Sequence, residues 1–270
     1  MNKKLLSLPY LFWSIMFILA PLCMVFYYGL TDKTGAFTLQ NILSITTPEH
    51  SKALWEAVKL SLASTVICLL LAYPLAMILS SLNSHQDSFI VLIFILPMWM
   101  NFLLRTMAWQ SLLEKTGVIN GILGWLHLPS LNIINTPGAI ILGMVYNFLP
   151  FMVLPIYNVL VKIDKNVINA ARDLGANFLQ TFWKILLPLS LPGIISGITM
   201  VFVPALTTFV ISRILGGGKI LLIGNIIEEE FTKTDNWNLG SGLSIVLMMF
   251  IIFNMVITAV TDKDGEVNAL

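Results

Sequence analysis

The sequence predicts an all-α membrane protein that crosses the bilayer six times. Its mean hydropathy is +0.87 over 270 residues, 57% of which are hydrophobic and only 11% charged. A soluble domain of this size needs a polar face on most of its helices. Several runs here are apolar throughout for the roughly 20 residues that a helix needs to cross a bilayer. We therefore treat residues 1–270 as a single transmembrane domain and disfavour a large soluble core.

Five runs contain no charged residue and are long enough to span: 5–31, 60–83, 137–160, 191–211 and 239–260. A sixth, 89–109, carries Asn101 and Arg105 near one end, where a long side chain reaches the interface or faces a protein interior. The first run follows Lys3 and Lys4 like a signal peptide, but it is too long and no small-residue cleavage site ends it. It is expected to remain as the first helix.

A glycine pair and a basic connection between two spans lead to two further predictions, one on helix packing and one on orientation. Gly193 and Gly197 form a GxxxG pair, which lets two helices approach closely. The connection 161–190, between the fourth and fifth spans, holds four cations: Lys162, Lys165, Arg172 and Lys184. Because basic loops stay in the cytoplasm, this connection and, with six spans, both termini are expected there.

The sequence lacks the residues that several classes of function require. A net charge of +1, without a basic stripe and interleaved aromatic residues, argues against nucleic-acid binding. The three histidines lie apart without metal-ligand spacing, so no metal site is expected. The run "GGGK" at 216–219 lacks the upstream Gly and the following Ser or Thr of a phosphate-binding loop. Uphill transport would then need either another chain that hydrolyses ATP or coupling to an ion gradient. Coupling to an ion gradient is disfavoured, because it needs charged residues inside the spans and these are scarce here.

The polar connection itself predicts a short amphipathic helix. Its apolar residues recur at i, i+3, i+4 and i+7: Val167, Ala170, Ala171 and Leu174. Asp164 or Asn166 is suited to cap its start, and Gly175 to take the left-handed conformation that ends it. A second amphipathic segment follows, and Pro188 is expected to break it. A helix lying on the bilayer and a helix docking on another protein both fit this pattern.

A family resemblance favours the second interpretation. The spacing of Ala170, Ala171, Gly175, Ile185, Leu187 and Pro188 resembles the cytoplasmic loop signature of permease subunits in binding-protein-dependent ABC importers. That signature usually begins with Glu, where this chain has Asn169, so a contact that depends on the Glu charge is not carried over. The segments 100–109, 143–157 and 215–227 are similar to spermidine/putrescine importer permeases.

The resemblance implies an assembly in a bacterial plasma membrane. The expected partners are a second homologous permease, two ATP-binding subunits, an extracytoplasmic polyamine-binding protein and membrane lipids. ATP and Mg²⁺ would bind the ATP-binding subunits, and this chain would be no enzyme and bind no cofactor. The residues expected to couple to the ATPase are Asn169, Ala170, Ala171, Arg172, Asp173, Gly175 and Pro188. A permease for another small solute and a channel or carrier outside the ABC class remain alternatives.

A cationic substrate would need carboxylates, aromatic faces and amide oxygens along its path. The residues that could supply them are Glu56, Trp99, Asn101, Trp109, Tyr146, Asn147 and Phe209. Each of these equally suits an interface anchor or a packing residue. The acidic run Glu228, Glu229 and Glu230 could attract the cation or simply be solvated.

Overall fold

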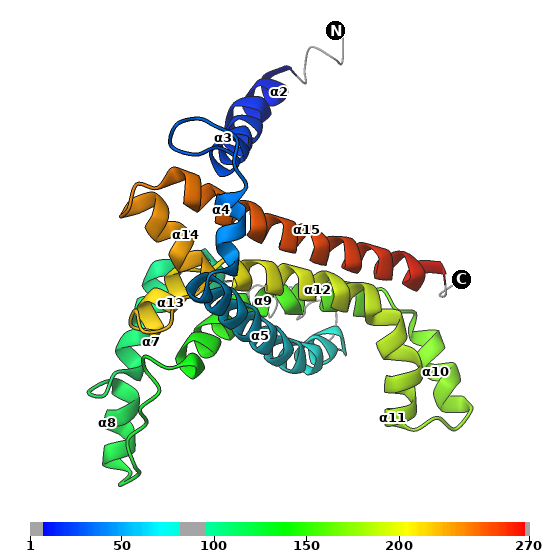
Figure 1. Cartoon of the computed structure of the whole chain (residues 1–270). Coiled ribbons are helices and arrows are strands. Elements are labelled where there is room, and N and C mark those ends of the chain that lie inside the picture. Colours follow the sequence, from blue (N-terminus) through cyan, green and yellow to red (C-terminus); the bar gives the residue numbers. More distant parts are fainter. Residues whose placement is uncertain (1–7, 82–95, 268–270) are drawn as a thin grey trace.

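Three long helices form the centre of the bundle in the computed structural model, which describes residues 8–81 and 96–267 (Figure 1). They are α5 (Pro48–Ser81), α9 (Pro137–Leu160) and α12 (Leu187–Thr207), and each packs against the other two. Met144, Met152 and Ile156 of α9 are completely buried among them. The only β-type pairing in the described ranges is an isolated bridge between Thr31 and Phe37.

The GxxxG pair of α12 lies against α9. A Cβ atom at Gly193 would stand 2.9 Å from the carbonyl oxygen of Pro155, and one at Gly197 would stand 3.3 Å from that of Met152. Contacts this close leave no room for a larger side chain, so the two backbones meet there through van der Waals packing. The close approach predicted for this pair is confirmed.

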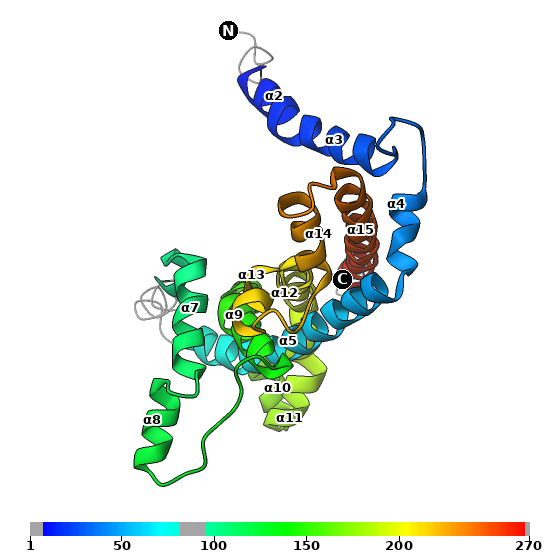
Figure 2. The same ribbon diagram turned by 60° about the vertical axis from the view of Figure 1, so that its left-hand side comes forward.

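The first and last helices flank this centre. The first is one continuous helical run made of α2 (Leu8–Ser14), a π-helical turn η1 (Ile15–Leu19) and α3 (Ala20–Gly29). This run projects from the rest of the bundle in Figure 2. Within Pro9–Gly29, which is long and apolar enough to span a membrane, only the last residue, Gly29, is buried. The last helix, α15 (Trp237–Val267), packs on α3, α12 and α14.

Short elements gather at the two ends of the bundle (Figure 1). One end carries α10 (Lys165–Asp173), α11 (Phe178–Thr181) and the π-helical turn η4 (Phe182–Leu186). The other carries α13 (Val210–Leu215) and α14 (Ile223–Thr232). The remaining elements are α4 (Gln40–Leu43), η2 (Ser44–Thr46), η3 (Leu96–Trp99), α7 (Phe102–Leu113) and α8 (Val118–Trp125).

Five helices of the described chain are long and apolar enough to cross a membrane: Pro9–Gly29, Pro48–Ser81, Pro137–Leu160, Phe178–Thr207 and Trp237–Val256. Each of them overlaps one of the five charge-free runs, although the helices that begin at Pro48 and Phe178 start well before the predicted runs 60–83 and 191–211. Of the sixth predicted span, residues 89–95 lie outside the described residues. The remainder is the 3-10 turn η3 and the separate helix α7, which Asn101 caps by accepting from the N–H groups of Leu103 (2.9 Å) and Leu104 (3.3 Å). The count of six therefore stays a prediction.

The fifth predicted span differs from the structure at both ends. Its helix starts upstream of residue 191, because α11, η4 and α12 run on continuously from Phe178. It ends at Thr207 rather than at 211, because Thr208 adopts an extended backbone (φ −66°, ψ 135°). A new helix, α13, begins two residues later.

Candidate functional site

The helix α10 has a defined start. The carboxylate of Asp164 lies at the N-cap and accepts from the backbone N–H of Asn166 at 2.9 Å. This bond satisfies one of the N–H groups that a first helical turn leaves without an internal partner. Of the two predicted caps, Asp164 is the one used.

The end of α10 is set by Gly175. Its φ of +83° lies in the left-handed region, and its N–H donates to the carbonyl of Arg172 at 2.8 Å. The N–H of Ala176 donates to the carbonyl of Ala171 at 3.0 Å, which completes the pair of bonds of a Schellman motif. The left-handed conformation predicted for Gly175 is confirmed, while its part in coupling stays a prediction.

The residues of the predicted apolar stripe of α10 differ widely in exposure. Ala171 is turned inward and only 9% exposed, whereas Val167 is 45% and Leu174 89% exposed. The exposed part continues through Phe178, Leu179 and Trp183, which follow Gly175. We call Val167, Leu174, Phe178, Leu179 and Trp183 the exposed apolar surface; Phe178 also lines a cavity behind α10. Large apolar side chains exposed along one segment mark a contact with protein or membrane.

The expectation that Pro188 breaks the second segment is wrong. The preceding turn, η4, is π-helical, and the N–H of Leu187 donates to the carbonyl of Phe182, five residues back. This wider turn shifts the hydrogen-bond register just before the proline, which has no N–H to donate, so the helix continues into α12. The segment is also tied to α5, because the ring of Phe182 packs edge-on against Tyr73 (5.4 Å between centroids) and the Tyr73 hydroxyl hydrogen-bonds Ser190 at 2.8 Å.

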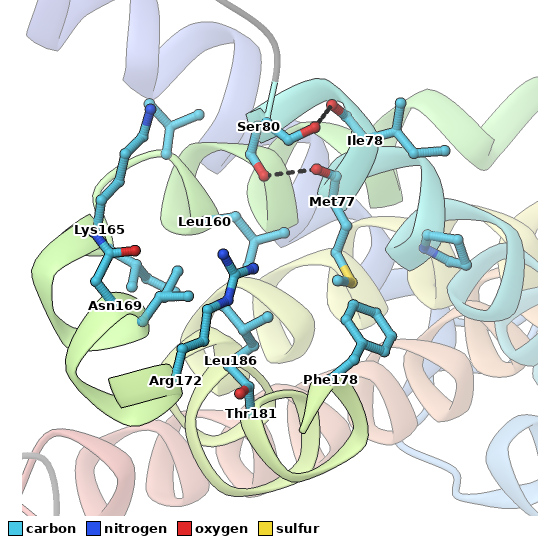
Figure 3. A pocket seen from close by; sticks show the side chains of 15 residues that line it. Met77, Ile78, Ser80, Leu160, Lys165, Asn169, Arg172, Phe178, Thr181 and Leu186 are labelled. Carbon is cyan, nitrogen blue, oxygen red and sulfur yellow. Dashed lines mark hydrogen bonds between the residues drawn. The ribbon is translucent and has the colours of Figure 1, made fainter. Parts of the chain in front are cut away.

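A cavity of about 670 Å³ lies behind α10, between this helix, α11 and the ends of α5 and α9 (Figure 3). Lys165, Asn169 and Arg172 line it from α10, where they stand at i, i+4 and i+7 on one helix face. Met77 and Phe178 lie on the opposite wall. Of the predicted coupling residues, Asn169 and Arg172 thus face the cavity.

At the other end of the bundle, the break after α12 is held by Asn225. This buried side chain accepts from the hydroxyl of Ser212 at 2.6 Å and from the N–H of Leu222 at 3.0 Å. Its amide group donates to the carbonyl of Phe209 at 2.9 Å. One side chain therefore joins the start and the body of α13 to the start of α14. Sequence reasoning missed this role, although an Asn inside the apolar run 220–227 is the signal for it.

The charges of α13 and α14 pair with one another. The guanidinium of Arg213 binds both carboxylate oxygens of Glu228, with one nitrogen-to-oxygen distance of 2.9 Å. Glu229 accepts from Lys233 at 2.6 Å and lies 3.9 Å from Arg213. The hydrogen bond from Arg213 holds the pKa of Glu228 below its ordinary value, against the opposing effect of partial burial. Glu228 and Glu229 are therefore part of an ion-pair network, while Glu230 accepts a hydrogen bond from the hydroxyl of Thr234.

Glu228 also lines a second cavity, of about 470 Å³, between the end of α12, α14 and α15. The ring of Phe209, one of the predicted substrate residues, lines the same cavity, together with Phe231. Thr207, Thr232 and Ser244 also line it, but their hydroxyls already donate to backbone carbonyls of their own helices, at 3.1, 2.7 and 2.8 Å, and the wall is mostly apolar. A carboxylate and two aromatic rings are groups that an alkylammonium ion favours. We call this the Glu228 cavity.

The other predicted substrate residues have local structural partners. Glu56 is paired with Lys59 at 3.0 Å, and Trp109 packs edge-on against Tyr146 with centroids 5.3 Å apart. Asn147 is buried and donates to the carbonyl of Gly143 at 2.9 Å.

The structure thus brings Trp109 together with Tyr146 and places Phe209 beside Glu228. Asn101 serves as the cap of α7, and Trp99 is 76% exposed. Glu56, Trp99 and Asn101 line neither of the two cavities.

Comparison with known proteins identifies the family of this chain. Residues 72–262, which include both cavities, match the family model described as "Binding-protein-dependent transport system inner membrane component". The chain is 38% identical over 253 residues to the spermidine/putrescine transport system permease protein PotB of Haemophilus influenzae, covering 89% of this chain and 88% of that one. It is 37% identical over 243 residues to PotB of Escherichia coli, covering 87% and 88%.

The solved structures include one with the same fold. A bacterial alginate ABC transporter, in complex with its alginate pentasaccharide-bound periplasmic protein, superimposes with a TM-score of 0.79 at 15% identity over 94% of this chain and 91% of that one. At this identity the likeness establishes the fold alone. The match over residues 72–262, together with relatives more than 35% identical over most of the chain, shows that this protein belongs to the family of binding-protein-dependent transport system inner membrane components.

Proposed function

We propose that this chain is the permease subunit of an ATP-driven importer that moves polyamines, spermidine and putrescine, into the cytoplasm by alternating access. The observation that carries the proposal is the 38% identity over 89% of the chain to a permease named for spermidine and putrescine. The family match over residues 72–262 includes α10 and α11 at one end of the bundle and α13 and α14 at the other.

In this proposal the bundle crosses the bacterial plasma membrane six times, with α10 and both termini in the cytoplasm. The basic residues of the connection that contains α10 support this orientation. So does the course of α15, which runs from the α14 end of the bundle toward the α10 end (Figure 1).

ATP hydrolysis is assigned to two separate ATP-binding subunits, onto which α10 docks as a coupling helix. The support is the exposed apolar surface, with Leu174 at 89% exposure, because such side chains gain free energy when a partner covers them. The continuous helix from Phe178 to Thr207 would carry a movement of α10 into the membrane, since no break separates α11 from α12. Gly175 sets the angle between α10 and this long helix.

On the outer side, a second homologous permease and an extracytoplasmic polyamine-binding protein complete the assembly. The Glu228 cavity is the proposed first cation contact on this chain. An ammonium group of the substrate would compete with Arg213 for the carboxylate, while the rings of Phe209 and Phe231 offer faces to the rest of the chain. Trp109 and Tyr146 remain candidates for a later contact.

Uptake of radiolabelled spermidine and putrescine tests the proposal in cells that carry the complete transport cassette, with and without this subunit. We expect uptake that disappears without the subunit and is competed only by unlabelled polyamines. Polyamine uptake that is unchanged without the subunit, with an ATP-binding subunit still co-purifying, would retain the importer and reject polyamines as its substrate.

A further inference from the structure

We propose that the cavity behind α10 binds a phosphate group, supplied by the headgroup of an anionic phospholipid. The inference rests on the proposed function for the placement of α10 at the cytoplasmic membrane surface. It adds a ligand, a site and a role in coupling that the proposed function does not contain.

The charged side chains that line the cavity favour an anionic ligand. The only charged side chains among the described residues that line the cavity are those of Lys165 and Arg172, and both are cations. Neither forms an ion pair with another described residue, whereas Arg213 and Lys233 at the opposite end both do. Two cations seven residues apart on one helix face can bind the same anion. Figure 3 shows the guanidinium of Arg172 reaching from α10 into the cavity.

The remaining polar groups of the cavity favour a ligand that accepts hydrogen bonds. The hydroxyls of Ser80, Ser81 and Thr181 already donate to backbone carbonyls within their own helices, at 3.0, 2.7 and 3.1 Å. The donors left for a ligand are therefore the two cations and the side-chain amide of Asn169. A phosphate diester, which carries one negative charge and several acceptor oxygens, matches this set.

The apolar walls distinguish a lipid from a soluble phosphate. Met77, Leu160 and Leu186 give the cavity an aliphatic side that an inorganic ion would leave uncovered. Glycerol and the first methylene groups of acyl chains would cover it, because apolar surface gains free energy when it leaves water. The cavity also lies level with the ends of α5 and α9, two candidate spans, which is the height of lipid headgroups.

A phosphate in this position would join α10 to the ends of α5 and α9. The helix would then move together with the bundle when an ATP-binding subunit pushes it, instead of sliding over it. We therefore expect substrate-stimulated ATP hydrolysis to require anionic lipid.

Native mass spectrometry of the complete transporter, extracted from bilayers containing phosphatidylglycerol, tests lipid retention. The double variant Lys165→Gln with Arg172→Gln removes both cavity cations. The double variant Lys162→Gln with Lys184→Gln removes the same charge from the same connection but from residues outside the cavity. We expect the first to retain about tenfold less phosphatidylglycerol than wild type, and the second to retain the wild-type amount. Equal retention by the two variants would overturn the proposal, as would a cavity variant that loses the ATP-binding subunits while keeping its lipid.

ATPase stimulation in nanodiscs identifies the source of the phosphate. Wild-type stimulation should be high with phosphatidylglycerol and low with phosphatidylcholine alone, and millimolar inorganic phosphate should not restore it. Restoration by inorganic phosphate would replace the lipid with a soluble ligand and reject the lipid source. Lipid retention is measured without transport, so a transporter that imports another solute leaves this test intact.

Discussion

The two ends of the bundle differ in whether their charged side chains are paired and in how far their apolar side chains are exposed. At the α13–α14 end, Arg213 pairs with Glu228, and Asn225 ties α13 to the start of α14. At the α10–α11 end, Lys165 and Arg172 form no ion pair with described residues, and Leu174 is almost fully exposed. Charges of the α13–α14 segment are thus paired with one another, while the α10–α11 segment has cations and exposed apolar side chains without a partner among the described residues. We propose that the α10–α11 segment is a contact surface and the α13–α14 segment a fixed support.

The largest effect is expected from the backbone at Gly175. Gly175 and Gly35 have nearly the same left-handed φ, +83° and +84°, and no atom would contact an added Cβ at either position. A valine at either site faces the same backbone penalty, roughly 1–2 kcal/mol. Gly175→Val should reduce coupled uptake about tenfold, because the end of α10 loses its angle, whereas Gly35→Val should leave uptake near wild type. Equal losses in the two variants would show that the α10 junction has no special role.

The second-largest effect is expected when a charged side chain is placed on the exposed apolar surface. Leu174→Asp costs the isolated subunit little, because the side chain is already in solvent, but it places a charge where a partner would bury it. We expect about a fivefold or greater loss of co-purifying ATP-binding subunit. Leu128→Asp, at a leucine that is 51% exposed in another connection, is the matched control. Co-purification that falls equally in both variants would mean that surface charge alone disturbs the complex.

The third prediction concerns stability at the α13–α14 end. Asn225→Ala leaves the buried N–H of Leu222 without its acceptor, at a cost of about 1–3 kcal/mol. The melting temperature of the purified complex should therefore fall. At the α10–α11 end, Asn177→Ala removes an exposed cap of α11, which accepts from the N–H of Gln180 at 2.8 Å, and should fray only that turn. A larger loss of stability in Asn177→Ala would reverse the assignment of rigid and adaptable ends.

A smaller effect is expected at the Glu228 cavity. Glu228→Gln removes the carboxylate that would hold the ammonium group and should raise the KM for spermidine a few-fold at low salt, with less effect at high salt. Glu56→Gln, which removes a carboxylate paired only with its neighbour Lys59, should leave KM unchanged. An unchanged KM in Glu228→Gln at both salt concentrations would remove the cavity from the substrate path.

The smallest effect is expected in the melting temperature when the pH is varied. The pKa of Glu228 lies below its ordinary value because Arg213 binds its charged form, so the carboxylate stays ionised at and above about pH 5. The support that this pair gives to the α13–α14 segment is present above the unfolded-state pKa and is lost only as the pH falls through the lower folded-state value. The melting temperature should show no step from this pair between about pH 5 and pH 8. A step in wild type that Glu228→Gln abolishes would contradict the assignment.

Local signals in the sequence predicted the elements that depend on neighbouring residues. The charge-free runs located the five candidate spans, and Asp164 and Gly175 marked both ends of α10 correctly. These features need only apolar length, a side-chain cap or a permissive backbone, and each is encoded within a few residues.

Features that depend on tertiary contacts were not predictable in this way. Pro188 continues the helix because a π-helical turn precedes it, and the ring of Phe182 in that turn packs on Tyr73 of α5. The break at Thr208 depends on Asn225, which comes 17 residues later, and the partner of Glu228 lies on a different helix. The sequence placed Glu56 among the candidate substrate residues and left the acidic run that contains Glu228 as either cation-attracting or solvated, and the pairing partners of both carboxylates are visible only in the structure.

Crosslinking at position 174 tests most directly whether the α10–α11 segment is completed by an ATP-binding subunit. In a Cys23→Ser background, which removes the exposed native thiol, the Leu174→Cys variant of the complete transporter is labelled with a maleimide photocrosslinker. The Leu128→Cys variant serves as the matched control. We predict a covalent adduct with the ATP-binding subunit from position 174 and none from position 128. Adducts of equal yield from both positions, or an adduct from position 174 with lipid alone, would contradict the account.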